Sequence, residues 1–590
     1  MPENSLSAIA AQPNPKLPRT PPAFNGLQVN FCKNPSCELF GVRVPETAKK
    51  GHGAKNSHIV VAFAKGDPAI RCNSCGEHFP LKSNLGIFEE FHRISKTTFT
   101  VPCCPDCMCS NHLVPITQPK AYHSFGLTTA GSHCYRCKVC SKTFSVKPKG
   151  INPIARQLRS DKNPPVLRML TGKMPLRRIC EAADVAPKVL YERIDFFHEQ
   201  SMALMAEREA KLASMNIRRL YIGVDRQEYV VNWTQRKDRR NVVITAVASA
   251  DNGTGYVFGM HPNFDPIPDP TVIQREVERI GDAALPSGYR RYARLWLQSD
   301  YEEAMHGSVR IAAGSLTGKI ANSYAQAAGR EDVESAEFFE QHEKLPNAGM
   351  LIHSEYTLYG HFMHLNRLLG GVEKLRFFLD QDSGIRAACL GAFHERVKNR
   401  TADALYVSMA KELTIDQKRQ RMSEARAAFT KESALHPGLS EAQVKLILLK
   451  RRIQEATALG QWRDRWVFHP LVSMSEPEKA SCLLTDLGDY DEDHLAWLHN
   501  KASLHAVDSW FNRLRRRSSM LERPITGASN RGRTWNGYSA YRPEQIEKLQ
   551  TIFRACHNYV WTGEKRTDTP AMRLGLAKAP LDYTDIIYFK

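Results

Sequence analysis

Two pairs of cysteines constrain this chain more than any other feature. Cys104 and Cys107 form one Cys-x-x-Cys pair, and Cys137 and Cys140 form another after twenty-nine intervening residues. Two short turns at such a separation bring four thiolates to the corners of a tetrahedron, which is the ligand set of a structural zinc ion. The pattern predicts a zinc ribbon, a small metal-dependent unit.

A second group of cysteines lies nearer the N-terminus. Cys32 and Cys37 have four residues between them, whereas Cys72 and Cys75 repeat the tighter spacing. This group predicts another ribbon, so two structural zinc ions are expected. Registers that use a neighbouring cysteine stay open, because three residues of this type are left over in the region: Cys103, Cys109 and Cys134.

Charge and cysteine usage narrow the class of protein. Across 590 residues, 81 Lys and Arg outnumber 62 Asp and Glu, and a net charge of +19 favours a polyanionic partner. No run of eighteen apolar residues occurs, so no membrane span is predicted. Eleven of the fifteen cysteines lie between Cys32 and Cys140, which indicates local metal sites in a reducing, cytoplasmic compartment.

Helical patterns follow the cysteine-rich region. Residues 174–194 resemble a helix-turn-helix, with a turn at 184–186 and Pro187 at the first position of the next helix. The second helix would carry Lys188, Tyr191 and Arg193 into a major groove of DNA. A plain helical hairpin is the alternative.

Apolar runs then alternate with helical patterns up to about residue 414. The expected elements are strands at 220–225, 241–250 and 255–260, a helix at 356–369, a strand at 375–380, a helix at 385–397 and a strand at 404–409. This is the element order of an RNase H-like fold. Two insertions are expected, at about 266–346 with a helix near 289–305, and at about 415–497, which reads as a helical insertion.

The chain is therefore predicted to be a multidomain α/β protein. The expected parts are a flexible tail (1–24), a first zinc ribbon (25–95), a second zinc ribbon (96–150), a helix-turn-helix (151–213) and an RNase H-like catalytic domain with helical insertions (214–590).

Acidic residues end two of the predicted strands. RNase H-like enzymes cut or join phosphodiester bonds with two divalent metals held by carboxylates from separate elements, and Mg²⁺ prefers such oxygen ligands. Asp225 ends the first strand, and Asp380 ends the fourth, which neighbours the first in this fold. Asp382 and Asp300 are the alternatives for the second acid.

The third acid is expected on the last core helix. Asp508 lies there, with Phe511 and Arg515 at helical spacing on roughly the same face. Glu522 is the alternative, but the following proline makes it a residue of a helix end. A basic cluster on this helix is expected to neutralise backbone phosphates, unless it is only a solvated face; it consists of Arg513, Arg515, Arg516 and Arg517.

Together these motifs resemble bacterial insertion-sequence transposases of the DDE class. The helix at 504–517 is similar to their Glu-Ser-Phe-Trp-x-x-Leu-Lys helix, with Asp508 in place of Glu. His557-Asn558-Tyr559, followed by Thr569-Pro570-Ala571-Met572, is similar to the signature that closes many transposase and integrase domains. The ribbon and helix-turn-helix resemble the DNA-binding front end of such proteins.

The resemblance implies a function and its partners. The chain would bind double-stranded DNA at element ends, hydrolyse it with two Mg²⁺, and join the freed 3′-hydroxyl to target DNA by transesterification. It also implies a homo-oligomer on paired ends. A non-catalytic zinc-ribbon DNA-binding regulator is the main alternative, and an RNase H-like nuclease without strand transfer is a third.

Overall fold

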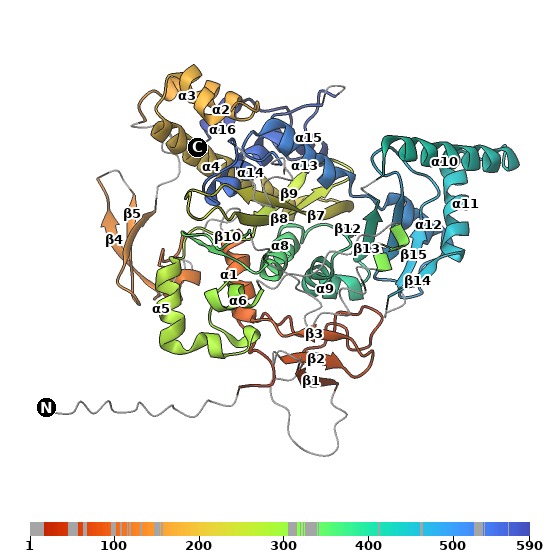
Figure 1. Ribbon diagram of the computed structural model, residues 1–590, viewed down its shortest axis with the longest axis horizontal. Coiled ribbons are helices and arrows are strands. Elements are labelled where there is room, and N and C mark those ends of the chain that lie inside the picture. The colour runs from red at the N-terminus through yellow and green to blue at the C-terminus, as the bar shows by residue number, and fades with distance from the viewer. Residues whose placement is uncertain are drawn as a thin grey trace, which may run out of the picture.

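An eight-stranded sheet forms the centre of the molecule (Figure 1). In this computed structural model its strands run in the order β14-β15-β16-β13-β12-β7-β8-β9. β7, β12 and β13 are parallel neighbours, and the remaining pairs are antiparallel. The strands are β7 (Arg219–Val231), β8 (Val242–Asp251), β9 (Val257–Pro262), β12 (Lys374–Asp380), β13 (Ala402–Met409), β14 (Thr457–Leu459), β15 (Asp464–Phe468) and β16 (Lys479–Leu483).

The structure describes most of the chain. The described residues are 17–44, 57–62, 68–95, 102–106, 109–114, 120–129, 132–146, 157–304, 342–410, 413–460, 464–523, 537–563 and 566–589, with isolated positions between these ranges.

Helices cover both faces of the sheet (Figure 1). α8 (Ser354–Leu368) and α9 (Ser383–Lys398) lie on one face, and α13 (His505–Arg517) and α14 (Glu544–Tyr559) lie on the other. β12 and β13 are buried over nearly their whole length, as expected for parallel strands covered on both sides. The mixed α/β class predicted from the sequence is confirmed.

Further helices surround this core. They are α1 (Asn84–Ser95), α5 (Pro270–Ile280), α6 (Gln298–Ala304), α10 (Ile415–Leu435), α11 (Glu441–Gln454), α12 (Glu492–Lys501), α15 (Pro570–Leu574) and α16 (Tyr583–Ile587).

Two sequence predictions about the insertions are wrong in part. Residues 289–305 were expected to form one helix, but only α6 is helical there, because Leu295 bridges Ile352 and Trp296 N–H donates to the Leu351 carbonyl in extended structure. The 415–497 segment contains α10, α11 and α12, but it also supplies β14, β15 and β16, which extend the main sheet. Its short buried strand at 479–483 carries too few residues for a clear pattern.

The N-terminal parts form small sheets and a helical unit. β1 (His58–Ala62), β2 (Pro68–Cys72) and β3 (His78–Pro80) make one three-stranded sheet, and β4 (Tyr122–Leu127), β5 (His133–Cys137) and β6 (Thr143–Val146) make another. α2 (Asn163–Leu170), α3 (Leu176–Ala183) and α4 (Pro187–Glu209) follow. The turn between α3 and α4 contains Asp184 in the left-handed region, and Pro187 begins α4, as predicted.

Candidate functional site

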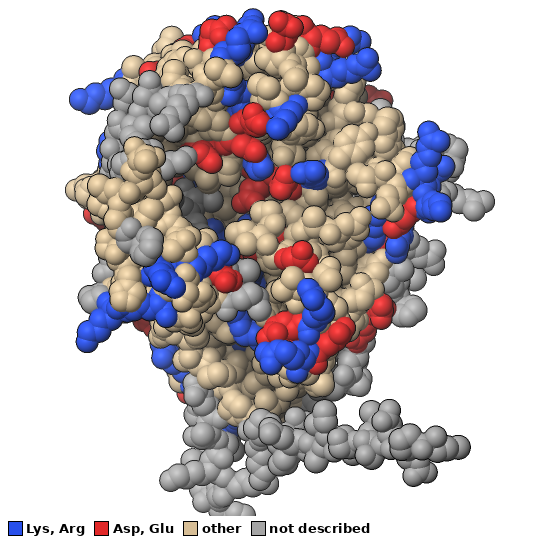
Figure 2. Space-filling model, turned by 90° about the vertical axis from the view of Figure 1, so that its left-hand side faces the viewer, with Lys and Arg blue, Asp and Glu red and all other residues tan. Residues whose placement is uncertain are grey.

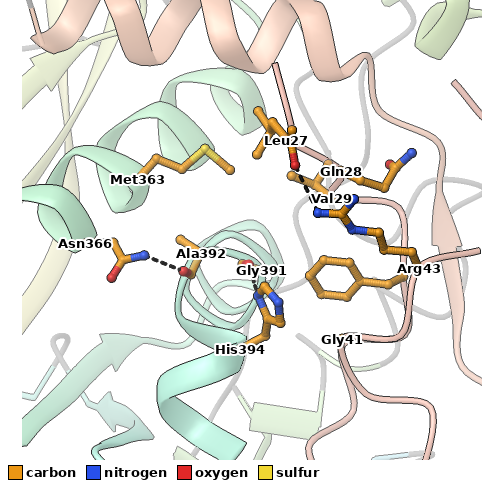
Figure 3. Close-up of a pocket in the computed structure, with 12 residues that line it drawn as sticks. Leu27, Gln28, Val29, Gly41, Arg43, Met363, Asn366, Gly391, Ala392 and His394 are labelled. Carbon is orange, nitrogen blue, oxygen red and sulfur yellow. Dashed lines mark hydrogen bonds between the residues drawn. The ribbon is translucent and has the colours of Figure 1, made fainter. Parts of the chain in front are cut away.

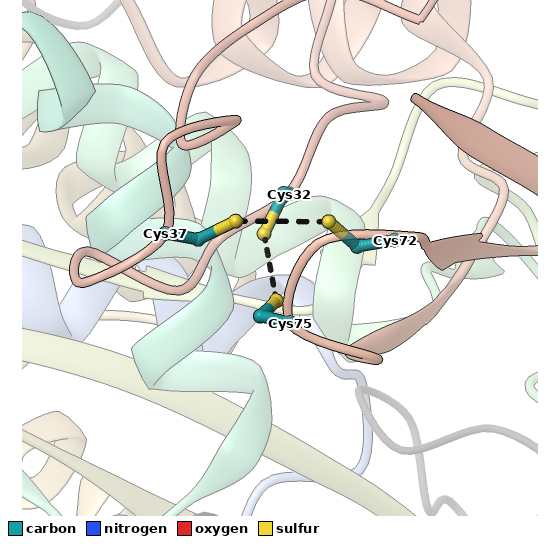
Figure 4. Close-up of side chains that lie close together, drawn as sticks. All are labelled: Cys32, Cys37, Cys72 and Cys75. Atoms are coloured by element: carbon teal, nitrogen blue, oxygen red, sulfur yellow. Dashed lines mark hydrogen bonds between the residues drawn. The ribbon is translucent and has the colours of Figure 1, made fainter. Parts of the chain in front are cut away.

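The first cysteine set joins a loop near the N-terminus to the turn after β2 (Figure 4). Cys32, Cys37, Cys72 and Cys75 place their sulfur atoms within 4.8 Å of one another. The Sγ–Sγ distance is 3.5 Å for Cys32 and Cys75 and 3.7 Å for Cys37 and Cys72. Four thiolates around one zinc ion lie about 3.8 Å apart, given Zn–S bonds of about 2.3 Å. The donor set therefore fits a structural zinc site, at the residues predicted.

The second set differs from the prediction in one member. Cys104, Cys137 and Cys140 come together with Cys109, again within 4.8 Å. The Sγ–Sγ distance is 3.4 Å for Cys104 and Cys140 and 3.6 Å for Cys109 and Cys137. Cys107, the expected fourth ligand, lies outside the described residues.

A sequence signal for Cys109 was overlooked. Four residues separate Cys104 from Cys109, and the same number separates Cys32 from Cys37 in the first set. The two ribbons thus share one ligand spacing, which the shorter Cys-x-x-Cys pair at 104–107 had hidden.

The electrostatics of both sets favour metal capture. Burial raises the pKa of Cys72 to about 11, whereas the hydrogen bond with Cys32 lowers the pKa of Cys75 to about 5. At Cys137, burial raises the pKa, but backbone N–H groups of Cys140 and Val139 outweigh it and the pKa falls to about 6. Each set thus contains one thiol whose pKa is lowered by its neighbours, which favours the thiolate form that metals bind.

Two of the predicted carboxylates lie on neighbouring parallel strands. The register of β12 on β7 pairs Leu379 with Val224, so Asp380 and Asp225 follow at the next position of each strand. Asp225 is 6% exposed, and its Oδ1 accepts a hydrogen bond of 2.7 Å from the Arg226 backbone N–H. Asp380 is half-buried at the end of β12.

Helix α13 packs against the face of β7 that carries Gly223 and Gln227. A Cβ on Gly223 would lie 3.5 Å from Val507 Cγ1, so the glycine allows this close approach. Farther along both elements, Arg515 Nη1 donates to Gln227 Oε1 at 3.2 Å. Gly223, Asp225 and Gln227 are alternate residues of the strand, so they lie on the same face of it.

Asp508 follows Val507, the α13 residue next to Gly223, and Asp225 lies two residues after Gly223 on β7. Among the described residues, the groups with three or more ligand atoms within 4.8 Å of one another are the two cysteine sets. The ligand atoms of Asp225, Asp380 and Asp508 are therefore spread more widely than those of the cysteines.

Each alternative acid is held in another arrangement. Asp382 caps α9, where its Oδ1 accepts from the Ile385 N–H at 2.9 Å, and it is ion-paired with Arg226. Asp300 lies 2.6 Å from Arg290 Nη1, and although burial opposes it, hydrogen bonding and charge from His353 and Arg290 lower its pKa to about 2.

Glu522 lies near the surface, 3.1 Å from Lys173 Nζ. Each of the three alternatives is thus ion-paired in the structure, Asp382 and Asp300 with arginines and Glu522 with Lys173.

The predicted DNA-contacting residues of α4 divide into two kinds. Lys188 is exposed and Tyr191 is 39% exposed near the start of the helix. Arg193 is only 6% exposed, and its guanidinium donates to the Leu158 carbonyl. The expectation that Arg193 reads a groove is therefore wrong, because its charge is used to fix the chain that enters α2.

The arginines of α13 are also unequal. Arg516 is exposed, and Arg517 stacks on Trp561 with its guanidinium carbon 4.3 Å from the ring centroid. Arg513 donates to His557 at 2.9 Å, and burial lowers its pKa. On the face shown in Figure 2, Lys and Arg side chains form several groups separated by acidic ones rather than one basic field.

The His557-Asn558-Tyr559 motif clamps the β8–β9 hairpin. Asn558 accepts from the Val257 N–H at 3.0 Å and donates to the Val257 carbonyl at 2.9 Å. His557 bonds the Gly255 carbonyl, and Tyr559 bonds Tyr256, both at 2.9 Å. These side chains are buried, so the motif positions the sheet edge and α13 rather than meeting a substrate.

The Thr569-Pro570-Ala571-Met572 motif has a similar role. Thr569 caps α15 with a capping box, and Arg573 Nε donates to the Thr254 carbonyl in the β8–β9 turn at 2.7 Å.

A cavity of about 260 Å³ lies between the N-terminal segment and helices α8 and α9 (Figure 3). Its polar groups are already paired: Arg43 donates to Gly26, Asn366 to Ala392, and His394 bonds Gly391. The remaining wall is mainly apolar, with Leu27, Val29, Phe31 and Met363. The cavity offers no convergent set of free polar groups and identifies no ligand.

Comparison with protein-family models finds no match, and comparison with curated proteins finds none either. Among the described residues, no helix has both the length and the apolar character needed to cross a membrane.

Proposed function

We propose that this chain is a DNA transposase of the DDE class, with Asp225, Asp380 and Asp508 as its catalytic acids. The observation that carries the proposal is the meeting of three separate elements: Asp225 and Asp380 occupy adjacent positions on parallel strands, and α13, the helix that carries Asp508, packs on β7 through Val507. The sheet order β9-β8-β7-β12-β13, with β8 antiparallel to both neighbours, supports an RNase H-like core.

The three carboxylates supply the chemistry of oxygen ligands. Two Mg²⁺ held there would activate the attacking water or 3′-hydroxyl and stabilise the leaving oxygen. Asp225 is fixed by its buried position and by the bond from the Arg226 N–H. Arg515, seven residues after Asp508, is half-buried beside Gln227 and would neutralise a phosphate next to the reacting one.

The N-terminal parts supply DNA binding in this proposal. The α3–α4 unit has the turn geometry of a helix-turn-helix, and Lys188 and Tyr191 are exposed at the start of α4. The second cysteine set, in the unit that contains β4–β6, would extend this contact along the duplex when it holds zinc.

The test is a Mg²⁺-dependent cleavage and strand-transfer assay on DNA that carries the ends of the element. Asp225→Asn, Asp380→Asn and Asp508→Asn keep side-chain size and remove charge. Each should lower cleavage by at least ~10²-fold, the size of effect expected when a group that stabilises transition-state charge is lost. Glu522→Gln and Asp300→Asn are the matched controls and should keep activity.

The regulator hypothesis predicts a different result, and the wide spread of the three carboxylates is the observation in its favour. A regulator would bind the same DNA and cut none of it. A nuclease without strand transfer would cut but leave the ends unjoined.

A further inference from the structure

The first cysteine set is attached to the core by buried polar contacts. Glu77 follows the second pair of cysteines and is 5% exposed. Its Oε2 lies 3.3 Å from Cys32 Sγ and accepts from the Lys33 N–H at 2.9 Å. Its Oε1 accepts from Arg386 Nη1 of α9 at 3.0 Å. One carboxylate thus joins both halves of the cysteine set to a core helix.

The contacts continue from α9 to the strand that carries Asp225. Asp382, four residues before Arg386, caps α9 and is ion-paired with Arg226. Arg226 directly follows Asp225 on β7. The backbone carbonyl of Asp382 also accepts from Tyr406 Oη of β13 at 3.1 Å, so the start of α9 is fixed to both neighbouring strands.

A second series of contacts from the first cysteine unit also reaches Arg226. Lys82, which follows β3, lies 3.3 Å from Glu355 of α8, and both side chains are less than 10% exposed. The next residues pair as well, since the Ser83 N–H donates to Tyr356 Oη at 3.1 Å. Ser354, adjacent to Glu355, accepts from Arg226 Nη1 at 3.3 Å.

The second cysteine set is held differently. Its small apolar cluster consists of its own residues, Cys104, Cys109 and Cys137 packed with Tyr122 and Cys140. The Tyr122 hydroxyl lies 2.6 Å from the carbonyls of Asn111 and Val114, within the same ribbon. In Figure 1, β4 and β5 stand out at the side of the molecule, whereas β1–β3 lie beneath α9.

From these contacts we infer that the first cysteine set is a metal-dependent brace of the core, not a DNA-reading module. Its metal would hold the loop of Cys32 and the turn of Cys72 together, and Glu77 would transmit that order through Arg386 to α9. Glu77 and Arg386 are positioning residues in this account. The consequence for Asp225 and the DNA binding of the second set rest on the proposed function; the attachment of α9 does not.

The first experiment removes one ligand from each set in the full-length protein. Cys75→Ser and Cys140→Ser are matched, because both thiols are half-buried members of their sets. The readouts are zinc content, hydrogen exchange of α9 amides, and affinity for a mixed-sequence DNA duplex. Cys75→Ser should speed exchange across 383–398 by at least about tenfold, because local opening becomes easier. Cys140→Ser should leave that exchange unchanged and weaken DNA binding.

The second experiment keeps all cysteines. Glu77→Gln removes the charge that pairs with Arg386, and Glu432→Gln is its control, since Glu432 is also 5% exposed and accepts from Arg451 of α11 at 3.0 Å. Glu77→Gln should lower zinc affinity roughly 10–100-fold, as substitutions beside a metal ligand do, and speed exchange of α9. Glu432→Gln should do neither.

Two results would overturn the inference. One is unchanged exchange of α9 in Cys75→Ser protein that has lost its first zinc ion. The other is an equal rate of hydrogen exchange of the α9 amides in Glu77→Gln and in Glu432→Gln. This second comparison decides the matter if the Cys75→Ser protein does not fold. Neither readout needs DNA cleavage, so failure here is distinct from failure of the proposed transposase activity.

Discussion

Replacing Asn558 by alanine isolates what the His-Asn-Tyr motif does. Asn558 is fully buried, and its amide bonds both the N–H and the carbonyl of Val257 at the outer edge of β9. Alanine removes both the amide oxygen and the amide N–H that bond Val257 and introduces no charged group. The backbone groups of Val257, a residue that is itself buried, would then have no partner on that side.

The size of the effect follows from these two bonds. A buried donor or acceptor left without its partner costs about 1–3 kcal/mol. Loss of both bonds should therefore lower the free energy of unfolding of the core by about 2–6 kcal/mol. Tyr559→Phe removes only the hydroxyl that bonds Tyr256 at 2.9 Å, and should cost about 1 kcal/mol.

Thermal unfolding and hydrogen exchange of the Val257 amide measure this loss of stability. We expect Asn558→Ala to lower the midpoint and to speed exchange in β9 before the rest of the sheet. Asn512→Ala on the exposed side of α13 is the control and should change stability by less than about 0.5 kcal/mol. If Asn558→Ala proves as stable as this control, the clamp described for the motif is wrong.

Two further predictions concern buried charge. Arg376 and Asp403 form a cross-strand ion pair at 2.6 Å, and both side chains are fully buried. Asp403→Ala should therefore lower the free energy of unfolding, measured by chemical denaturation, by about 3–5 kcal/mol, and the double variant Arg376→Met with Asp403→Leu should restore most of this loss. An Asp403→Ala protein of unchanged stability would contradict the prediction. Burial lowers the pKa of His361 and His557 from 6.5 to about 3, so as the pH falls these histidines are protonated in the unfolded chain before they are protonated in the folded protein. Stability should be complete above pH 6.5 and fall by about 1.4 kcal/mol per pH unit for each histidine as the pH drops toward 3. Thermal unfolding between pH 7.5 and 4.5 checks this, and a flat profile would count against it.

The core strands were predictable because their apolar runs are long and end in recognisable turns. β7 nevertheless extends to Val231, well beyond the expected end at Asp225. The polar run after Asp225 concealed this, although Gln227 is 4% exposed beneath α13 and Tyr229 is 5% exposed. A strand under a helix can bury polar side chains that bond across the interface, and a single sequence does not reveal the interface.

The errors in the insertions have a related cause. Trp296 and its neighbours show a helical period, but they form extended structure because their backbone bonds residues 351 and 352, far along the chain. Likewise, Arg193 looks like a surface base on α4 until the Leu158 carbonyl is placed beside it. Contacts between distant segments decide such positions, whereas local spacing was enough to find the cysteines.

Iron-directed cleavage of the protein tests whether Asp225, Asp380 and Asp508 bind the same metal ions. Fe²⁺ replaces Mg²⁺ at oxygen-ligand sites, and with ascorbate and peroxide it generates radicals that cut the nearest backbone. We expect cuts near residues 225, 380 and 508 in one protein, all suppressed together by excess Mg²⁺ and all lost in Asp225→Asn. Cuts near only one of these positions, or cuts that Asp225→Asn leaves unchanged, would contradict it.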